Sequence, residues 1–500
     1  MQTKIKTILA IFILFVSTSS CDDYLDLRPQ DGIVRDEFWK TKEDIQAAVI
    51  GIYSSMLSTP PVPGVSDLPL SQYLFMYGEL RADMIAPGPN VTEDQRDIMN
   101  SNIIASNELT NWDAFYRTIN YCNTVIQLAP AVRAEDPTLT EAQLNHFLSE
   151  ALAIRAYLYF TLARTFRDVP LKLTATLSDA ESFQIPTNTQ SEIFAQVIKD
   201  LELAEQYGVE DYGNNPSNRG RITTYAINAM LTDVYLWTDN YEKAIAAADK
   251  VIASPRFGLI PASSSWFTTV YAQGNSIESI FEFQYSTSNL GPFYNILFLR
   301  PQFLGGADVL EDIFGIDLAN ANNRDVRGER ASLVPGVSLI FKYIGFDFNT
   351  FKELQNADTH WFVYRFADVL LMKAEALTEL NRGQEAIAII EDLREKRNAL
   401  ELTSENVGSE NKIEIINYLL AERAREFAYE GKRWFDLLRN ARRNNYARLD
   451  ILLNAGISGA LPEQQQSVLA KLRDPNSHYL PINTFELFTN KALVQNPFYK

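Results

Sequence analysis

Residues 223–253 read TTYAINAMLTDVYLWTDNYEKAIAAADKVIA, and this stretch indicates how the chain folds. Hydrophobic residues recur at helical spacing over 223–237 and again over 241–253, with a short turn between the two runs. Small residues would let the two helices approach closely, while larger ones fill the gaps between them. The small residues are Ala226, Ala229, Ala244 and Ala248, and the larger ones are Leu231, Tyr235, Leu236 and Tyr241. This pattern predicts a helical hairpin of the tetratricopeptide type.

Similar helical runs lie elsewhere in the chain. Helices are predicted over 147–166 and 191–207, and a further pair over 361–380 and 384–393. Another helix begins near Thr41, which forms an acidic capping box with Asp44 and precedes a helical stripe of apolar residues. The repeats are degenerate and long insertions separate them, so unrelated helices with alanine-rich faces are the alternative to hairpins. We predict a mostly α fold with a scaffold of tetratricopeptide-like hairpins.

Three segments, 73–107, 259–356 and 400–412, lack helical periodicity and are rich in Gly, Pro, Asn and Ser. They predict loops and a few short strands, with one strand over 279–285, where apolar and polar residues alternate. The charged run at 93–97 is interpreted as a solvated loop. Long irregular segments in compact proteins are usually functional or disordered. The many aromatic residues in the insertions near 60–110 and 257–356 favour a functional role.

The first residues have the pattern of an export signal. Lys4 and Lys6 precede an apolar run over 8–16, and small polar residues over 17–20 lead to Cys21. The apolar run is too short to cross a bilayer. We predict a signal peptide over 1–20, a lipid on Cys21, a tether over 21–40 and one domain over 41–500. An ordinary secreted protein with an incidental Cys21 is the alternative.

The net charge and the cysteine content limit the partners and the covalent bonds expected of this protein. The formal net charge is −18, and removal of the two leader lysines makes it −20. Nucleic acid and anionic membrane surfaces are therefore unfavourable partners. Only Cys21 and Cys122 occur, so lipidation of Cys21 leaves no disulfide. Cys122 lies in an apolar helical pattern and is expected in the core.

Blocks of residues along nearly the whole chain share the pattern of one family. The two longest blocks are YRFADVLLMKAEA at 364–376 and ERAREFAYEGKRWFDLLR at 422–439. Shorter ones are residues 21–26 and 38–41, Ala47, Ala48, Gly51, Tyr53, Trp112, Phe115, Tyr116, Asn120, Asn123, Glu150, Ala151, Arg155, Ala156, Tyr159, Pro481, Ile482, Gln495, Asn496, Pro497 and Tyr499. The chain thereby resembles the SusD/RagB family of surface lipoproteins, which Bacteroidetes pair with TonB-dependent outer-membrane transporters. It departs from the family pattern at Asn483, often proline, and at Phe498, often glycine.

This resemblance implies a fold, a place in the cell and a partner. The fold would be four tetratricopeptide-like hairpins that carry a ligand surface made by the irregular insertions. The protein would be lipid-anchored on the outer face of the outer membrane, and Asp22 and Asp23 resemble a surface-export signal, although a solvated linker would look the same. It would capture oligosaccharides or polysaccharides and deliver them to a SusC-like TonB-dependent transporter.

Motifs for catalysis are missing from the sequence. The three histidines are not in metal-ligand spacing, and no G-x-S-x-G motif, phosphate loop, dinucleotide fingerprint or EF-hand run occurs. We therefore predict no enzymatic activity, no cofactor and no metal site. The sequence leaves open a structural calcium ion and a glycosidase-like pair of carboxylates. The charges at Arg433, Asp436 and Arg439, which follow a predicted left-handed C-cap at Gly431, are interpreted as an ion-pair network and not as an active site.

Sugar binding needs flat aromatic faces and planar hydrogen-bonding groups, and the insertions supply both kinds of residue. The ligand candidates are Tyr73, Tyr77, Arg81, Asn100, Asn102, Trp266, Tyr271, Tyr285, Phe293, Tyr294 and Asn295. For each ring, packing in the core is an equally open alternative. Trp112, Trp361 and Trp434 lie in helical patterns and are expected in the core.

Four functions remain after these considerations. The first is non-catalytic capture of glycans, and the second is a receptor for peptides or another nutrient on the same scaffold. A surface hydrolase and a scaffold without a ligand of its own are the other two.

Overall fold

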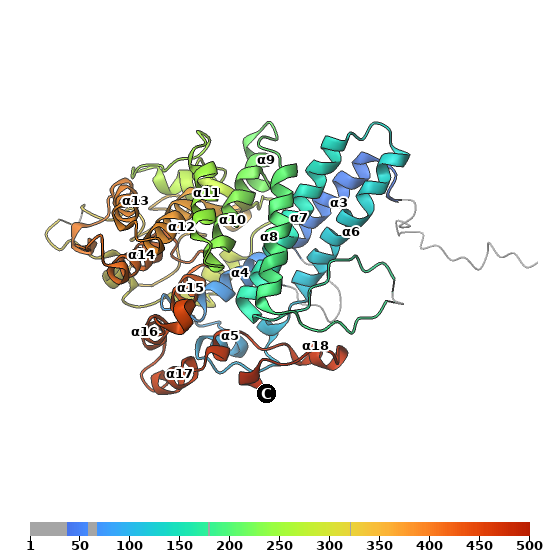
Figure 1. The fold of residues 1–500 in the computed structure, drawn as a ribbon. Coiled ribbons are helices and arrows are strands. Elements are labelled where there is room, and N and C mark those ends of the chain that lie inside the picture. Colours follow the sequence, from blue (N-terminus) through green and yellow to red (C-terminus); the bar gives the residue numbers. More distant parts are fainter. Residues whose placement is uncertain (1–37, 59–67, 179–180, 321) are drawn as a thin grey trace, which may run out of the picture.

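A row of packed helices forms the scaffold of the protein, as the computed structural model shows (Figure 1). The structure describes residues 38–58, 68–178, 181–320 and 322–500. The predicted signal peptide, Cys21 and most of the predicted tether lie outside these residues. Within the described part, no helix is long and apolar enough to cross a membrane.

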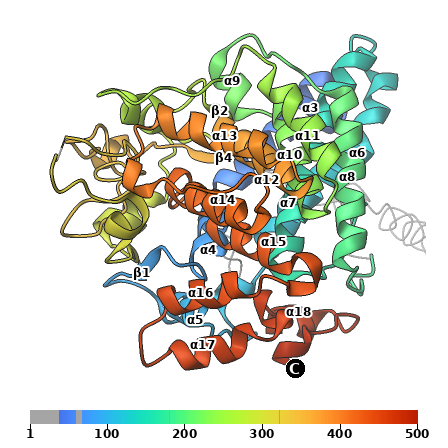
Figure 2. The ribbon, with the colours of Figure 1, turned by 60° about the vertical axis from the view of Figure 1, so that its left-hand side comes forward.

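The scaffold helices follow one another along the chain and most pack side by side, α6 on α7, α7 on α8, α8 on α10, and so on through α14, with the short α9 skipped. They are α3 (Lys42–Leu57), α4 (Leu70–Glu79), α5 (Glu93–Met99), α6 (Asp113–Glu135), α7 (Glu141–Phe166), α8 (Gln190–Tyr207), α9 (Asn215–Gly220), α10 (Thr224–Trp237), α11 (Tyr241–Ile252), α12 (Phe366–Glu379), α13 (Gly383–Lys396), α14 (Lys412–Glu426) and α15 (Arg433–Tyr446). Three short helices, α16 (Asp450–Gly459), α17 (Gln465–Leu472) and α18 (Thr484–Thr489), gather with the C-terminus at one end of the molecule, the lower edge in Figures 1 and 2.

The hairpin predicted from residues 223–253 is confirmed. Helices α10 and α11 pack together, and the four small residues between them have no exposed surface. The chain reverses at Asp239, whose φ of 57° is left-handed. The capping box of Thr41 and Asp44 is also confirmed, and α5, α7 and α8 begin with the same arrangement. The mostly α fold with helical hairpins is therefore as predicted.

One predicted helix begins too early in the sequence. Residues Trp361–Arg365 form strand β4 and not the start of a helix, because they pair antiparallel with β2 (Ser279–Phe283). All five are buried, and a short buried run reads equally as helix or strand from periodicity. The strand predicted over 279–285 is confirmed as β2.

The first predicted insertion also contains more helix than its composition suggests. All ten residues of α4 are buried, so no side of this helix faces solvent. The charged run at 93–97 is not a loop but most of α5, which Thr92 and Gln95 cap. Strand β1 (Ile85–Pro87) then pairs with β3 (Phe303–Gly305) and joins the two insertions.

The second insertion lies on the side of the molecule away from α3 and α6 (yellow in Figures 1 and 2). It contains β2, β3 and several short turns of helix between α11 and β4. On the scaffold side, Cys122 is fully buried in α6, and burial raises the pKa of its thiol to about 12. Its predicted place in the core is confirmed, and its thiol is protonated at neutral pH.

Candidate ligand-binding site

The predicted ligand rings lie inside the protein. Tyr73, Tyr77, Trp266, Tyr271, Tyr285, Phe293 and Tyr294 are each at most 6% exposed. Their neighbours are other rings: Phe293, for example, stacks on Trp361 with centroids 5.0 Å apart. This corrects the expectation that these rings present flat faces to a ligand, and the core-packing alternative describes them. The segments that carry them lack helical periodicity, yet they fold back onto the scaffold.

The polar candidates have different positions. Arg81 is buried, where it donates to the carbonyl of His478 at 2.6 Å and lies over the Trp434 ring. Asn100 follows α5 and is half-buried, whereas Asn102 is exposed and accepts from Lys471. Asn295 is exposed at the start of a short π-helix in the second insertion. A ligand contact at these three asparagines stays a prediction.

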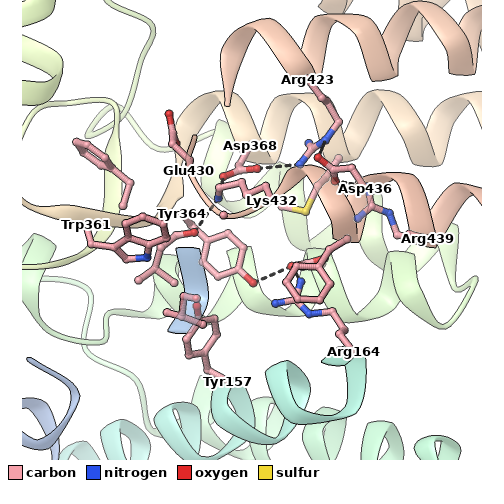
Figure 3. Close-up of a pocket in the computed structure, with 17 residues that line it drawn as sticks. Tyr157, Arg164, Trp361, Tyr364, Asp368, Arg423, Glu430, Lys432, Asp436 and Arg439 are labelled. Atoms are coloured by element: carbon pink, nitrogen blue, oxygen red, sulfur yellow. Dashed lines mark hydrogen bonds and ion pairs between the residues drawn. The ribbon is translucent and has the colours of Figure 1, made fainter. Parts of the chain in front are cut away.

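A buried group of charges lies where α12, α14 and α15 meet, and we call Asp368, Arg423, Lys432, Asp436 and Arg439 the ionic cluster (Figure 3). Arg423 bridges Asp368 at 3.2 Å and Asp436 at 2.7 Å, and Arg439 adds a second contact to Asp436 at 2.9 Å. The cavity among these side chains is about 40 Å³. That volume suits a few water molecules and is far below a ligand pocket of roughly 300–1,000 Å³.

A second buried network holds the second insertion on the scaffold. Arg365 and Arg397 both contact Glu278 and Glu426, and Arg327 from the insertion contacts Glu426 and Glu422. Burial would raise the pKa of Glu422, but Arg327, Arg425 and Arg394 outweigh it and hold the pKa at about 2. Glu422 and Glu426 are therefore ionised and paired with arginines.

The charged residues near Gly431 form ion pairs as predicted, but the predicted end of the helix before them is wrong. Helix α14 ends at Glu426, five residues before Gly431, which does have the expected positive φ of 69°. Arg439 and Asp436 belong to the ionic cluster, whereas Arg433 forms a two-bond pair with Asp83 at 2.7 and 2.8 Å.

An open cleft of about 780 Å³ lies elsewhere, between α6, the segments 170–176 and 182–185, and α18. We call it the aromatic cleft. Its floor is one face of α6, where Trp112, Tyr116, Ile119, Asn120 and Asn123 follow helical spacing. The volume falls within the range of small-molecule sites.

The rings of the cleft floor contact neighbouring groups, whereas the two phenylalanine rings at its edge are exposed to solvent. Trp112 is buried as predicted and meets Tyr116 edge-on at 5.6 Å, while the Tyr116 hydroxyl donates to the carbonyl of Pro170. Phe183 and Phe485 line the cleft from opposite segments and are 51% and 65% exposed. Large exposed phenylalanines that share a cleft form a surface suited to stacking.

The two outer walls are hydrogen-bonded to each other. Gln184 donates to the carbonyl of Thr489 at 2.9 Å and accepts from the backbone N–H of Lys491 at 2.7 Å. Asn490 donates to the carbonyl of Ile185 at 2.7 Å. These three bonds position Phe183 and Phe485 relative to each other.

The charges of the cleft are of both signs. Lys172 pairs with Glu181 at 3.1 Å, and two nitrogens of Arg117, Nε and Nη2, are covered but have no hydrogen-bond partner in the described part of the chain. Burial raises the pKa of Glu486, a hydrogen bond from Trp112 opposes the rise, and the charge of Asp113 adds to it.

Among the described residues, no group of three His, Cys, Asp or Glu side chains could hold a metal ion.

Sequence reasoning missed the aromatic cleft as a site. Trp112 was correctly predicted in the core, but nothing in its helical pattern shows that its edge forms the floor of a cleft. Phe183 and Phe485 are separated by some three hundred residues of sequence, and neither lies in a predicted insertion. The only available signal was a phenylalanine pair at 485 and 488 in a segment with little other apolar periodicity.

Comparisons with known proteins agree over most of the chain. Residues 334–499 match the model of the SusD family, and residues 72–236 match a model described as "Starch-binding associating with outer membrane". Two SusD-like proteins of Formosa agariphila are each 26% identical to this chain; the matches cover 87% and 86% of it and 92% and 90% of those proteins.

Solved structures show the same fold. A SusD superfamily protein from Bacteroides vulgatus superposes with a TM-score of 0.72 at 21% identity, over 92% of this chain and 100% of that one. A protein from the same species, described as a putative sugar binding protein, gives a TM-score of 0.69 at 18% identity, over 92% and 99% of the two chains.

Proposed function

Because this chain belongs to the SusD/RagB family, we propose that it captures oligosaccharides in the aromatic cleft and delivers them to a SusC-like TonB-dependent transporter. Carbohydrate binding and association with the outer membrane are the functions that the matched family model names. The lipid on Cys21, the outward orientation, the non-catalytic role and the transporter are parts of the proposal.

One observation carries the choice of site, namely that Phe183 and Phe485 are exposed and face one cleft. The C–H face of a pyranose stacks on such rings, while hydroxyls need planar polar groups and charges. Arg117 and Asn120 from α6 and Lys172 from the opposite wall line the same cleft. The described structure thus combines stacking surfaces with hydrogen-bonding groups where a sugar can reach them.

We expect Phe485→Ala to weaken oligosaccharide binding about ten-fold, because the sugar then loses most of one stacking surface. Isothermal titration calorimetry against a broad panel of glycans, including maltooligosaccharides, measures the change. Phe346→Ala is the matched control, since Phe346 is 53% exposed but lies in the second insertion, outside the cleft.

Equal affinities of the two variants would remove the aromatic cleft as the capture site. If the wild-type protein bound peptides but no glycan of the panel, the peptide-receptor alternative would replace glycan capture. If the glycans became shorter during incubation, the protein would be a surface hydrolase.

We expect Cys21→Ser to move the protein from the outer-membrane fraction to the soluble fraction, because several acyl chains on one cysteine anchor a protein stably. Cell fractionation and protease treatment of intact cells measure attachment and orientation. Cys122→Ala is the control, since it changes the other cysteine and leaves the lipid. A Cys21→Ser protein that stayed with the membrane would refute the anchor, and copurification of the wild type with a TonB-dependent transporter would support the partner.

A further inference from the structure

Helix α18 presents two phenylalanines to solvent. Phe485 lines the aromatic cleft, whereas Phe488, one turn later and 73% exposed, lies just beyond the residues that line it. Residues three apart on a helix have Cβ atoms about 5–6 Å apart. This spacing is close to the length of one pyranose unit in an extended chain.

Phe488 is largely exposed, and the helix that carries it is anchored. The Lys491 ammonium lies 4.7 Å from the centre of its ring, and most of the ring surface remains exposed. The backbone N–H of Lys491 in turn donates to Gln184, and Gln184 and Asn490 tie the end of α18 to the opposite wall. Because the backbone under the ring is already held, little backbone freedom is lost when a ligand covers the ring.

A third exposed apolar residue lies near the start of α18. The backbone N–H of Thr484 donates to the carbonyl of Ala105 at 2.8 Å, and the neighbouring Ile104 is exposed. Single exposed apolar residues are ordinary, but Phe485 and Phe488 lie three residues apart on one short helix, and Phe485 lines a cleft. Their spacing places a second exposed ring next to the one inside the cleft.

We infer that Phe488 is an outer sugar subsite, so that an oligosaccharide held on Phe485 inside the cleft continues over Phe488 as it leaves. The inference rests on the proposed capture of glycans in the aromatic cleft. The ligand is then a chain longer than a disaccharide, because a shorter sugar cannot cover the floor of the cleft and both rings of α18. Phe488 determines the length of chain that is recognised, and the cleft itself determines the sugar.

The length dependence of binding tests this subsite. The probes are two series, maltose to maltoheptaose and cellobiose to cellohexaose, together with the length series of any other panel glycan that binds. They are titrated calorimetrically into wild type, Phe488→Ala, Phe488→Tyr and Phe346→Ala. For the series that binds, wild-type affinity should rise with chain length. Phe488→Ala should remove about ten-fold of the affinity for the longest members and leave the shortest members unchanged. Phe488→Tyr keeps a ring and should behave as wild type.

The possible results separate the subsite from the capture site. If Phe488→Ala matched wild type at every length while Phe485→Ala weakened binding, the outer subsite would be wrong and glycan capture in the cleft would stand. A loss in Phe488→Ala that was equal at all lengths would also overturn the subsite, since it would indicate a change in the cleft. Absence of wild-type binding to both series and to the wider glycan panel would overturn the capture function and the subsite together. Thermal unfolding of each variant confirms that the exposed position leaves the fold intact.

Discussion

Arg365→Met is expected to lower the free energy of unfolding by about 3–5 kcal/mol, because it removes one partner from a buried ion-pair network. Arg365 is fully buried and donates to Glu430 at 2.8 and 3.0 Å and to Glu426 at 2.8 Å. Methionine keeps much of the volume but leaves both buried carboxylates with fewer cations. Urea denaturation followed by circular dichroism measures the change.

Arg382→Met is the matched control. Arg382 also makes a two-bond pair, with Glu385 at 2.7 Å, but the two side chains are 45% and 56% exposed. An exposed pair contributes at most about 1 kcal/mol, since water and salt replace the lost partner. If both variants lost the same stability, burial of the network would not be what makes Arg365 important.

Gly78→Ala is expected to destabilise the protein by at least about 3 kcal/mol, although helix propensity alone predicts a gain of about 1 kcal/mol. Gly78 lies inside α4, where a Cβ would come within 1.8 Å of the backbone oxygen of Gly431. Gly431 has a φ of 69° and is itself in close contact with α4, so neither backbone can move away cheaply. Because helix propensity and the steric clash act in opposite directions, the sign of the change in stability shows which of them is larger.

Gly51→Ala provides the comparison, because Gly51 also lies inside a helix, α3, and a Cβ there would meet no atom within 4 Å. We expect this variant to be more stable than wild type by up to about 1 kcal/mol. Denaturation curves of the two alanine variants should therefore shift in opposite directions. A Gly78→Ala protein as stable as Gly51→Ala would show that α4 and Gly431 are not in close contact in solution.

The sequence supports prediction of those parts of the fold whose pattern is local. Helices α10 and α11 were predictable because their apolar and small residues recur at helical spacing on either side of a short turn, and Ser279–Phe283 because polar and apolar residues partly alternate in its sequence. Helix α4 and strand β4 were missed, since α4 is short and lies between segments rich in Gly and Pro, and the buried run of β4 continues directly into α12. Tertiary contacts decide such segments, and one sequence does not contain them in readable form.

The site was harder to predict than the fold for the same physical reason. Tyr73, Trp266 and similar residues lie in segments that look like exposed loops, yet the folded chain covers them. Phe485 lies outside the segments that look like exposed loops, yet its ring remains exposed. Which aromatic residue is covered depends on contacts such as that of Gln184 with Thr489, which join distant parts of the chain.

The hydrogen bonds of Gln184 and Asn490 to the opposite wall have a consequence for how the protein is made. Because α18 and Leu493 supply one wall of the aromatic cleft, the residues that complete the cleft are among the last to be synthesised. A chain that ended before α18 would lack Phe485 and the hydrogen bonds of Gln184 and Asn490, so the cleft would be open on that side. The proposed binding site is thus complete only when nearly the whole chain has been made.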